Sequence, residues 1–384
     1  MIKKKIKLID IAIYIVLACT YIIPTGFIQT SFDFSKLVFS SLFCVLILLR
    51  GKIKTSEILM AMAIVLLTVI TKNLSFLTFL PLLYIGEIVE NKDAIKRKIL
   101  GSNVLYVCLA FTIFYSVLSI FLVSVPEGSL MRFARTGIVE PNQSAFAIFI
   151  LGVLLLKKNK KIGIATLFFG FLTFSRLYML SVVLFAFSKT NFAKKIIGKI
   201  DEKKWTYLRL TFIFLVLLVL LGFWYLALYQ NGYILPDSQL TNRFSLLDYS
   251  NLHRFTVNIM FIYMLIVSPK EYLLFGIDND KFVDNMRHLA NNEFGVHYSG
   301  NVPHNLFLSH LKTYGLFAFF ELYYTSKYLK MIITKHNFVI FIIIFLTSSL
   351  LGCGLYSYWL YLSMFALTTY MDSSSLVTKR ILHK

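Results

Sequence analysis

Long apolar segments alternate with short polar connections along almost the whole chain of 384 residues. A helix that crosses a bilayer needs about 20 mostly apolar residues, and windows of this kind predict about twelve spans. The fold expected from this pattern is an all-α polytopic integral membrane protein with a single transmembrane domain over residues 1–384. The short segments 162–174 and 177–188 also fit one bent or re-entrant element. The candidate spans are residues 8–28, 35–50, 56–72, 74–90, 100–125, 142–156, 162–174, 177–188, 207–228, 305–326, 337–355 and 356–371.

The amino-acid composition points the same way. Hydrophobic residues make up 58% of the chain and charged residues only 15%, whereas a soluble domain carries about 25% charged residues. This balance argues against a soluble enzyme, a nucleic-acid binder and a disordered chain. The basic N-terminus leads into the apolar run Ile11–Ile23 without a small-residue cleavage site, which predicts an uncleaved first span. The cysteines show no CxxC spacing, so neither a disulfide framework nor a zinc site is predicted.

The basic residues predict the orientation of the chain in the membrane. Of the 39 lysines and arginines, 28 lie in alternate connections and near the termini, so we expect both termini to be cytoplasmic. Six of the other 11 are arginines, against four of the inner 28. Arginine grips phosphate or carboxylate with two parallel hydrogen bonds, so the outer arginines predict an anionic ligand, although salt bridges to outer acidic residues also fit. The outer set is Lys36, Lys72, Arg132, Arg135, Arg176, Arg243, Arg254, Lys270, Lys281, Arg287 and Lys312.

One external connection, residues 229–303, is much longer than the others. Loops of this size are rare in compact proteins and are usually functional. The apolar run Phe255–Val267 within it is too short to span a bilayer, so we expect it to lie at the interface or to dip back in. We therefore expect this long external loop to contain short helices.

Polar phrases recur on the expected external side, in a fixed order along the chain. They are Glu140-Pro141-Asn142-Gln143, Thr173-Phe174-Ser175-Arg176, Arg254 followed by Leu273-Leu274-Phe275-Gly276-Ile277, and Val302-Pro303-His304-Asn305 followed by Gly315-Leu316. Together they resemble the O-antigen ligase and Wzy-type polysaccharide polymerase family over roughly residues 125–330. The chain departs from the family pattern at Leu177, after Gly276 and at Thr313, which affects the details of the substrate pocket.

The resemblance implies a membrane glycosyltransferase of the GT-C kind in the bacterial cytoplasmic membrane. Its donor would be a glycan on undecaprenyl diphosphate, and its acceptor another glycan at the external face. No cofactor and no metal are implied. Membrane lipids are expected partners, a chain-length regulator and a flippase are further candidates, and no nucleic acid is expected.

The residue types suit this chemistry. Departure of a lipid diphosphate builds negative charge that arginine donors stabilise, and the acceptor hydroxyl needs a base such as histidine. We therefore expect His304, Arg176 and Arg254 to be catalytic. The expected substrate-binding residues are Arg132, Arg135, Asn142, Gln143, Ser175, Arg243 and Asn305.

Each phrase also has a purely structural interpretation. Pro303-His304-Asn305 fits an ordinary helix N-cap, and Pro141-Asn142 fits an ordinary helix entry. Ser175-Arg176 fits a turn with a snorkelling arginine, and Arg254 fits an ion pair with Asp248. The phrase Asp278-Asn279-Asp280 looks like a metal motif of nucleotide-sugar enzymes, but its external position favours a solvated turn.

Other function classes also fit parts of the pattern. A ligase that transfers glycan to lipid A core would use the same donor, and the sequence separates it only weakly from the preferred polymerase. A lipid-linked oligosaccharide flippase can have a similar number of spans, but transporters place ionisable residues in mid-membrane, where this chain has almost none. A non-enzymatic scaffold would not need the external arginines or the His-Asn helix start.

Overall fold

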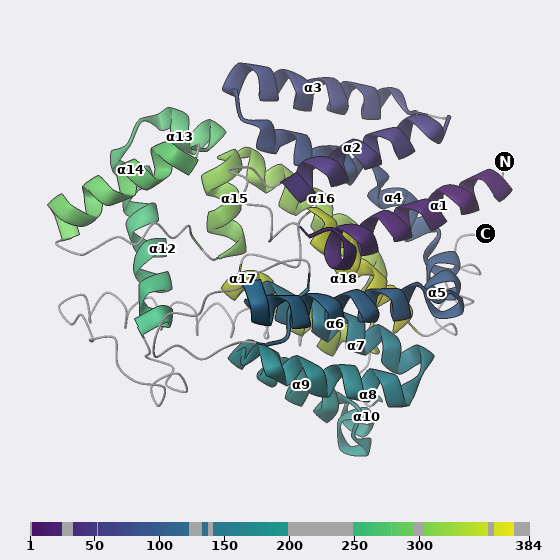
Figure 1. The fold of residues 1–384 in the computed structure, drawn as a ribbon. Coiled ribbons are helices and arrows are strands. Elements are labelled where there is room, and N and C mark those ends of the chain that lie inside the picture. The colour runs from purple at the N-terminus through teal and green to yellow at the C-terminus, as the bar shows by residue number, and fades with distance from the viewer. Residues whose placement is uncertain are drawn as a thin grey trace.

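The computed structural model describes residues 2–24, 34–51, 53–122, 133–136, 141–198, 249–277, 279–294, 303, 305–351 and 357–371. Every regular element in these ranges is a helix, and none of them contains a strand. The expected all-α fold is therefore confirmed for this part of the chain (Figure 1).

The helices follow the apolar segments of the sequence closely. The expected pair 162–174 and 177–188 forms two separate elements, and the expected segment 305–326 is divided at Gly315. The expected span 207–228 lies outside the described residues. The helices are α1 (Ile2–Leu17), η1 (Ala18–Ile22), α2 (Phe34–Leu49), α3 (Thr55–Thr71), η2 (Leu74–Tyr84), α4 (Ile85–Glu90), α5 (Lys92–Gly101), α6 (Val104–Leu122), α7 (Pro141–Lys158), α8 (Lys160–Phe169), η3 (Gly170–Thr173), α9 (Arg176–Ser188), α10 (Asn191–Gly198), α12 (Tyr249–Val267), α13 (Lys270–Phe275), α14 (Asn279–Leu289), η5 (Ala290–Phe294), α15 (Leu306–Tyr314), α16 (Phe317–Ile332), α17 (Phe338–Leu351) and α18 (Ser357–Thr369).

The expected count of twelve spans is not supported. Among the described residues one helix, α6, is long and apolar enough to cross a membrane, and a second candidate is the pair η2–α4 with α5, which is bent by 86°. Two physical causes shorten the others. Backbone breaks divide apolar segments, as Gly315 does between α15 and α16, and several helices stop early, such as α9 with 13 residues and α17 with 14.

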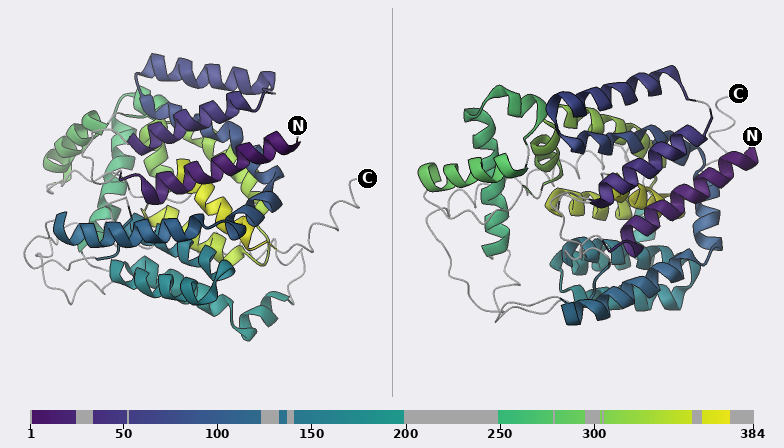
Figure 2. Two further views of the ribbon diagram at one scale, coloured as in Figure 1. Left: turned by 45° about the vertical axis from the view of Figure 1, so that its right-hand side comes forward. Right: turned by 45° about the horizontal axis from the view of Figure 1, so that its top comes forward.

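The helices form a bundle with two distinct ends. In Figures 1 and 2, α5 and the start of α1 lie at one end, and α12, α13 and α14 lie at the other. Contacts between distant segments support this division. Lys96 Nζ donates to the Met371 carbonyl at 2.9 Å, and Lys157 Nζ and Lys189 Nζ lie 4.7 and 4.5 Å from the centre of the Tyr370 ring. Three connections expected on the cytoplasmic side therefore meet at one end of the bundle.

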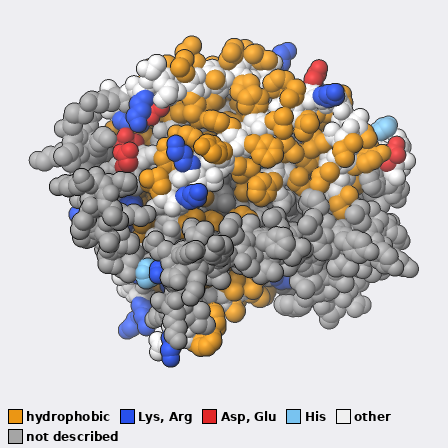
Figure 3. All heavy atoms as spheres, turned by 180° about the vertical axis from the view of Figure 1, so that it is seen from behind, with side chains coloured by type: hydrophobic (Ala, Val, Ile, Leu, Met, Phe, Trp, Pro, Cys, Tyr) orange, Lys and Arg blue, Asp and Glu red, His pale blue; other side chains and the backbone are white. Residues whose placement is uncertain are grey.

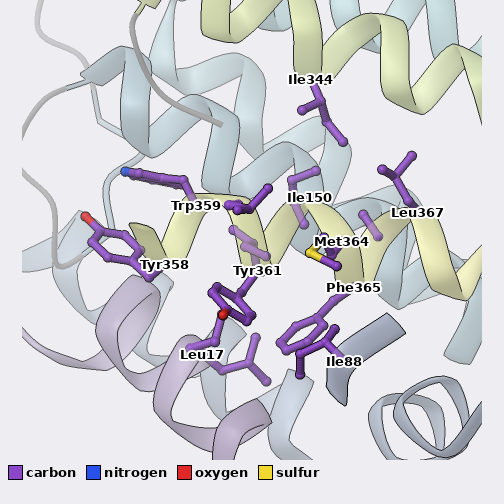
Figure 4. Close-up of a cluster of buried hydrophobic side chains, with 14 of the residues drawn as sticks. Leu17, Ile88, Ile150, Ile344, Tyr358, Trp359, Tyr361, Met364, Phe365 and Leu367 are labelled. Carbon is purple, nitrogen blue, oxygen red and sulfur yellow. The ribbon is translucent and has the colours of Figure 1, made fainter. Parts of the chain in front are cut away.

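The main core surrounds α18 (Figure 4). Every side chain described from Tyr358 to Met371 is buried, as expected for a helix that is apolar on all sides. Trp359 and Phe365 are fully enclosed, and the Tyr361 hydroxyl donates to the Pro81 carbonyl in η2. Because α18 contacts α1, α2, α5 and α7, this one helix fixes the relative positions of much of the bundle.

A second, smaller core lies under α12 and α14. It includes Val257, Phe261, Phe282 and Met286. The helix α12 starts at Tyr249, six residues before the expected apolar run Phe255–Val267, so its polar first turns are helical as well. The second half of the expected external loop therefore contains short helices with a core of their own.

The outer faces of several helices are strongly apolar. On α3 the residues Leu59, Met62, Leu66 and Val69 recur at helical spacing, and each exposes about 60% or more of its surface (59–68%). On α6 only 33% of the apolar window is buried, unlike the core helix of a soluble protein. Apolar side chains also cover much of the face in Figure 3. Contiguous exposed apolar surface of this kind marks contact with a membrane or another protein.

Candidate functional site

The segment 133–136 joins the start of α7 to α6. The backbone N–H of Arg135 donates to Ser116 Oγ at 2.8 Å, and the Ser116 hydroxyl donates to the Arg135 carbonyl at 3.1 Å. The next residue, Thr136, donates its N–H to Ser144 Oγ in the first turn of α7 at 3.2 Å. Arg135 is buried, with 7% of its surface exposed. The expected Arg135 and the Asn142-Gln143 helix start are therefore neighbours in space.

The same segment reaches the turn before α9. The N–H groups of Phe133 and Ala134 both donate to the Leu172 carbonyl, at 3.0 and 3.3 Å. Phe174 adopts a left-handed backbone with φ 48°, which costs a residue with a side chain roughly 1–2 kcal/mol. Ser175 then takes the N-cap position, and Arg176 begins α9. A strained residue directly before a candidate site is a common feature of functional turns.

A small hollow brings two of the sequence phrases together. Asn142 from α7 and Ser175 from the turn line it, with Tyr178 and Ser181 of α9 and Thr347 of α17. Its volume is about 10 Å³, which is about the space that one water molecule needs. The hollow therefore marks where these segments meet and does not enclose a substrate.

Arg176 begins α9 between the lining residues Ser175 and Leu177 but does not itself line the hollow. It shares a helix face with the exposed residues Leu180, Val183 and Phe187, whereas Tyr178 and Ser181 face the hollow. In the first turn of a helix the Cα–Cβ bond tilts toward the N-terminus, so the side chain of Arg176 starts out toward the end of the bundle.

The Pro-His-Asn phrase meets the same region through α17. Asn305 is the N-cap of α15, and its Oδ1 accepts from the N–H groups of Phe307 and Leu308 at 2.9 and 3.3 Å. Its Nδ2 donates to the Ser349 carbonyl at 3.2 Å. Ser349 is two residues after Thr347 on α17, so the two residues lie on nearly opposite faces of that helix. The capping interpretation of Asn305 is confirmed, and this side chain joins the start of α15 to α17, whose Thr347 lines the hollow.

The segment Leu273-Leu274-Phe275-Gly276-Ile277 packs against the end of α15. The Ile277 N–H donates to the Lys312 carbonyl at 2.7 Å, and the Leu316 N–H donates to the Leu273 carbonyl at 2.9 Å. Gly276 and Gly315 have φ values of 80° and 58°, and a Cβ added to Gly315 would lie 2.6 Å from the Gly276 nitrogen. The two backbones touch at a distance that only glycine permits.

Three helices begin in this region, at Pro141, Arg176 and Leu306. The first N–H groups of a helix and its macrodipole make its N-terminus a favourable place for an anion. Asn305 Oδ1 already accepts from two of these N–H groups in α15, which leaves the starts of α7 and α9, near Arg135 and Arg176. Among the described residues no carboxylate lines the hollow.

The structure describes only part of the expected site. It brings together Arg135, Asn142, Gln143, Ser175, Arg176 and Asn305. Arg254 lies in α12, but its side chain is outside the described residues. The expected residues Arg132, Arg243 and His304 also lie outside them.

Sequence reasoning missed the polar end of α17. Thr347, Ser348 and Ser349 are all buried, and this short hydroxyl run joins the hollow to the Asn305 cap. The signal was visible as three consecutive polar residues near the end of the apolar segment 337–355. Sequence reasoning also missed the buried contact between His310 and Glu321, because residues 11 positions apart in one continuous helix lie about 16 Å apart along its axis.

The part of the chain that the structure describes holds no group of three or more His, Cys, Asp or Glu residues placed to bind a metal ion. In comparisons with known proteins, no protein-family model, no curated protein and no solved structure matches the chain.

Proposed function

We propose that this protein is a membrane glycosyltransferase that polymerises a bacterial polysaccharide. It joins repeat units carried on undecaprenyl diphosphate at the outer face of the cytoplasmic membrane. The observation that carries the proposal is a convergence. The segment from Arg135 to Asn142, the turn at Ser175 and the helix start at Asn305 are far apart in the sequence, yet they lie at the same end of the bundle.

The membrane location is supported by the surface of the helices. Stripes such as Leu59, Met62 and Leu66 on α3 would expose a large apolar area to water, which a soluble protein avoids. Lysines from alternate connections also gather at one end of the bundle, as cytoplasmic loops do. In this arrangement the candidate site lies at the opposite, external end.

The charge of the site suits a diphosphate leaving group. Bond cleavage at the sugar transfers negative charge to the diphosphate, and fixed positive groups stabilise that charge as it develops. Arg176, the first residue of α9, and the N-terminus of that helix provide such groups. Arg135, held through its backbone by Ser116, provides a second arginine on the neighbouring segment.

The base in this proposal is His304, which directly precedes the Asn305 cap. It accepts the proton of the acceptor hydroxyl while the bond between the sugar and the diphosphate breaks. The proton therefore passes to His304, and the negative charge passes to the departing diphosphate. Asn305 fixes the backbone next to His304 through its bond to α17, and so acts as a positioning residue. The hollow is too small to enclose a sugar, so in this proposal the long lipid-linked substrate lies in the membrane and in the space outside it.

Deletion of the gene followed by glycan profiling tests the proposal. Loss of a polymerase leaves single repeat units on the lipid carrier at the outer face. Long free chains that fail to reach lipid A would instead indicate a ligase, and accumulation at the inner leaflet would indicate a flippase. Either of these profiles, or an unchanged profile, contradicts the proposal.

A further inference from the structure

We propose that His310 and Glu321 form a buried positioning pair that orients the start of α15 for the chemistry at the external site. His310 Nδ1 and Glu321 Oε2 lie 2.6 Å apart. The exposed fraction is 3% for His310 and 2% for Glu321. The effect on turnover rests on the proposed function, but the effect on α15 does not.

The contact depends on the break between α15 and α16. In an unbroken helix, residues 11 positions apart are separated by about 16 Å along the axis, so these side chains could not meet. Gly315, with φ 58° and ψ −143°, ends α15 and allows the chain to turn before α16. The pair therefore holds two helices together across the turn and restricts the angle between them.

The environment shows that this pair is unusual for its location. Both residues fall in the apolar segment expected to span the membrane, where ionisable side chains are costly and usually have a function. Close to them, the His310 ring packs edge-on against Tyr314, with ring centres 5.6 Å apart, and the Tyr314 hydroxyl lies 2.6 Å from Thr78 Oγ1. Replacing a buried ion pair by apolar residues often leaves a protein equally stable, so stability alone does not account for such a pair.

The pair is connected to the site by a short structural path. His310 lies on the same nine-residue helix as the Asn305 cap, and that cap is bonded to Ser349 beside the hollow. A rotation of α15 about its axis would break the contact between the Asn305 cap and Ser349. The buried contact between His310 Nδ1 and Glu321 Oε2 ties α15 to α16, and it therefore opposes this rotation.

The test separates orientation from stability. The variants are His310→Ala, Glu321→Ala, Glu321→Gln and the apolar pair His310→Leu with Glu321→Met. Thr325→Val is the matched control, because Thr325 is buried on α16 one turn after Glu321. Each variant is measured in the full chain for thermal unfolding, for hydrogen exchange at the Phe307 and Leu308 amides that Asn305 caps, and for kcat and KM.

The single alanine variants are expected to unfold at lower temperature. The apolar pair is expected to regain the wild-type unfolding temperature but to show faster hydrogen exchange at the two capped amides. Its kcat is expected to fall by up to about 100-fold, which is the cost of a small misplacement at an active site. Glu321→Gln keeps a polar contact and is expected to retain more activity than Glu321→Ala. Thr325→Val is expected to behave as wild type in all three measurements.

Two results would overturn the inference. One is an apolar pair that regains both stability and full kcat, which would show a structural role only. The other is unchanged exchange at both amides in every variant. If the wild-type protein forms no polymer, the proposed function fails, and the exchange measurement still decides whether the pair orients α15.

Discussion

The crossing of two backbones at Gly276 and Gly315 gives the sharpest structural prediction. Gly276 has φ 80° and ψ −176°, a region that is almost exclusive to glycine and costs other residues about 1–3 kcal/mol. A Cβ at this position would lie 2.7 Å from the Tyr314 nitrogen, which is a backbone atom and cannot rotate away. Forcing such a contact apart costs about 1–3 kcal/mol more. Gly276→Ala should therefore destabilise the protein by about 2–6 kcal/mol in total.

Unfolding of the purified protein by heat or denaturant measures this loss. Gly101→Ala is the control, because Gly101 also lies in a described helix but has no heavy atom within 4 Å of its added Cβ. That variant should change stability by no more than about 1 kcal/mol. A shift of the backbone that relieves the clash at one of these positions also relieves the clash at the other. The double variant Gly276→Ala with Gly315→Ala should therefore lose less stability than the sum of the two single changes. A Gly276→Ala protein as stable as Gly101→Ala would refute the close approach of α13 and α15.

The remaining predictions concern the cap, the charge and the membrane. Asn305→Ala should lower the free energy of unfolding by about 2 kcal/mol, because it removes an N-cap and a buried hydrogen bond. Asn305→Asp should keep the cap and lose less stability. Equal losses of stability in the two variants would contradict this. Arg176→Lys should lower glycan extension in complemented deletion cells, since lysine cannot bind phosphate with two parallel hydrogen bonds, and full activity would indicate that charge alone suffices. In an otherwise cysteine-free protein, Met62→Cys should resist a membrane-impermeant maleimide, because its side chain faces lipid. Lys160→Cys, at an exposed position in an expected cytoplasmic connection, should react once the cytoplasmic side is opened. Fast labelling of Met62→Cys from water would argue against a membrane-embedded α3.

The positions of helices were predictable because they follow from apolar runs bounded by polar residues. The expected segment 142–156 corresponds to α7 at Pro141–Lys158, and 177–188 corresponds to α9 at Arg176–Ser188. The breaks were harder to predict. Nothing local to Gly315 indicates that another backbone lies against it, so the segment 305–326 reads as one continuous helix in sequence and forms two in the structure.

The sequence placed the candidate residues on one side of the protein but did not indicate how they are connected. Residue type and order placed Asn142, Ser175 and Asn305 on one side of the protein. The part played by α17 was not visible, because the bond from Asn305 to Ser349 joins residues 44 positions apart. The contact between His310 and Glu321 was hidden for the same reason, since it depends on a turn set by tertiary packing.

The central claim is that residues at the external end of the bundle transfer glycan from a lipid diphosphate. The most direct measurement incubates the purified protein in lipid vesicles with a repeat unit linked to undecaprenyl diphosphate and determines the length of the products. The wild-type protein should form chains of several repeats, while Arg176→Ala and His304→Ala, inserted in the vesicles to the same level, should leave the single repeat unit unchanged. Chains of normal length from both variants, or no chain from the wild-type protein, would contradict the account.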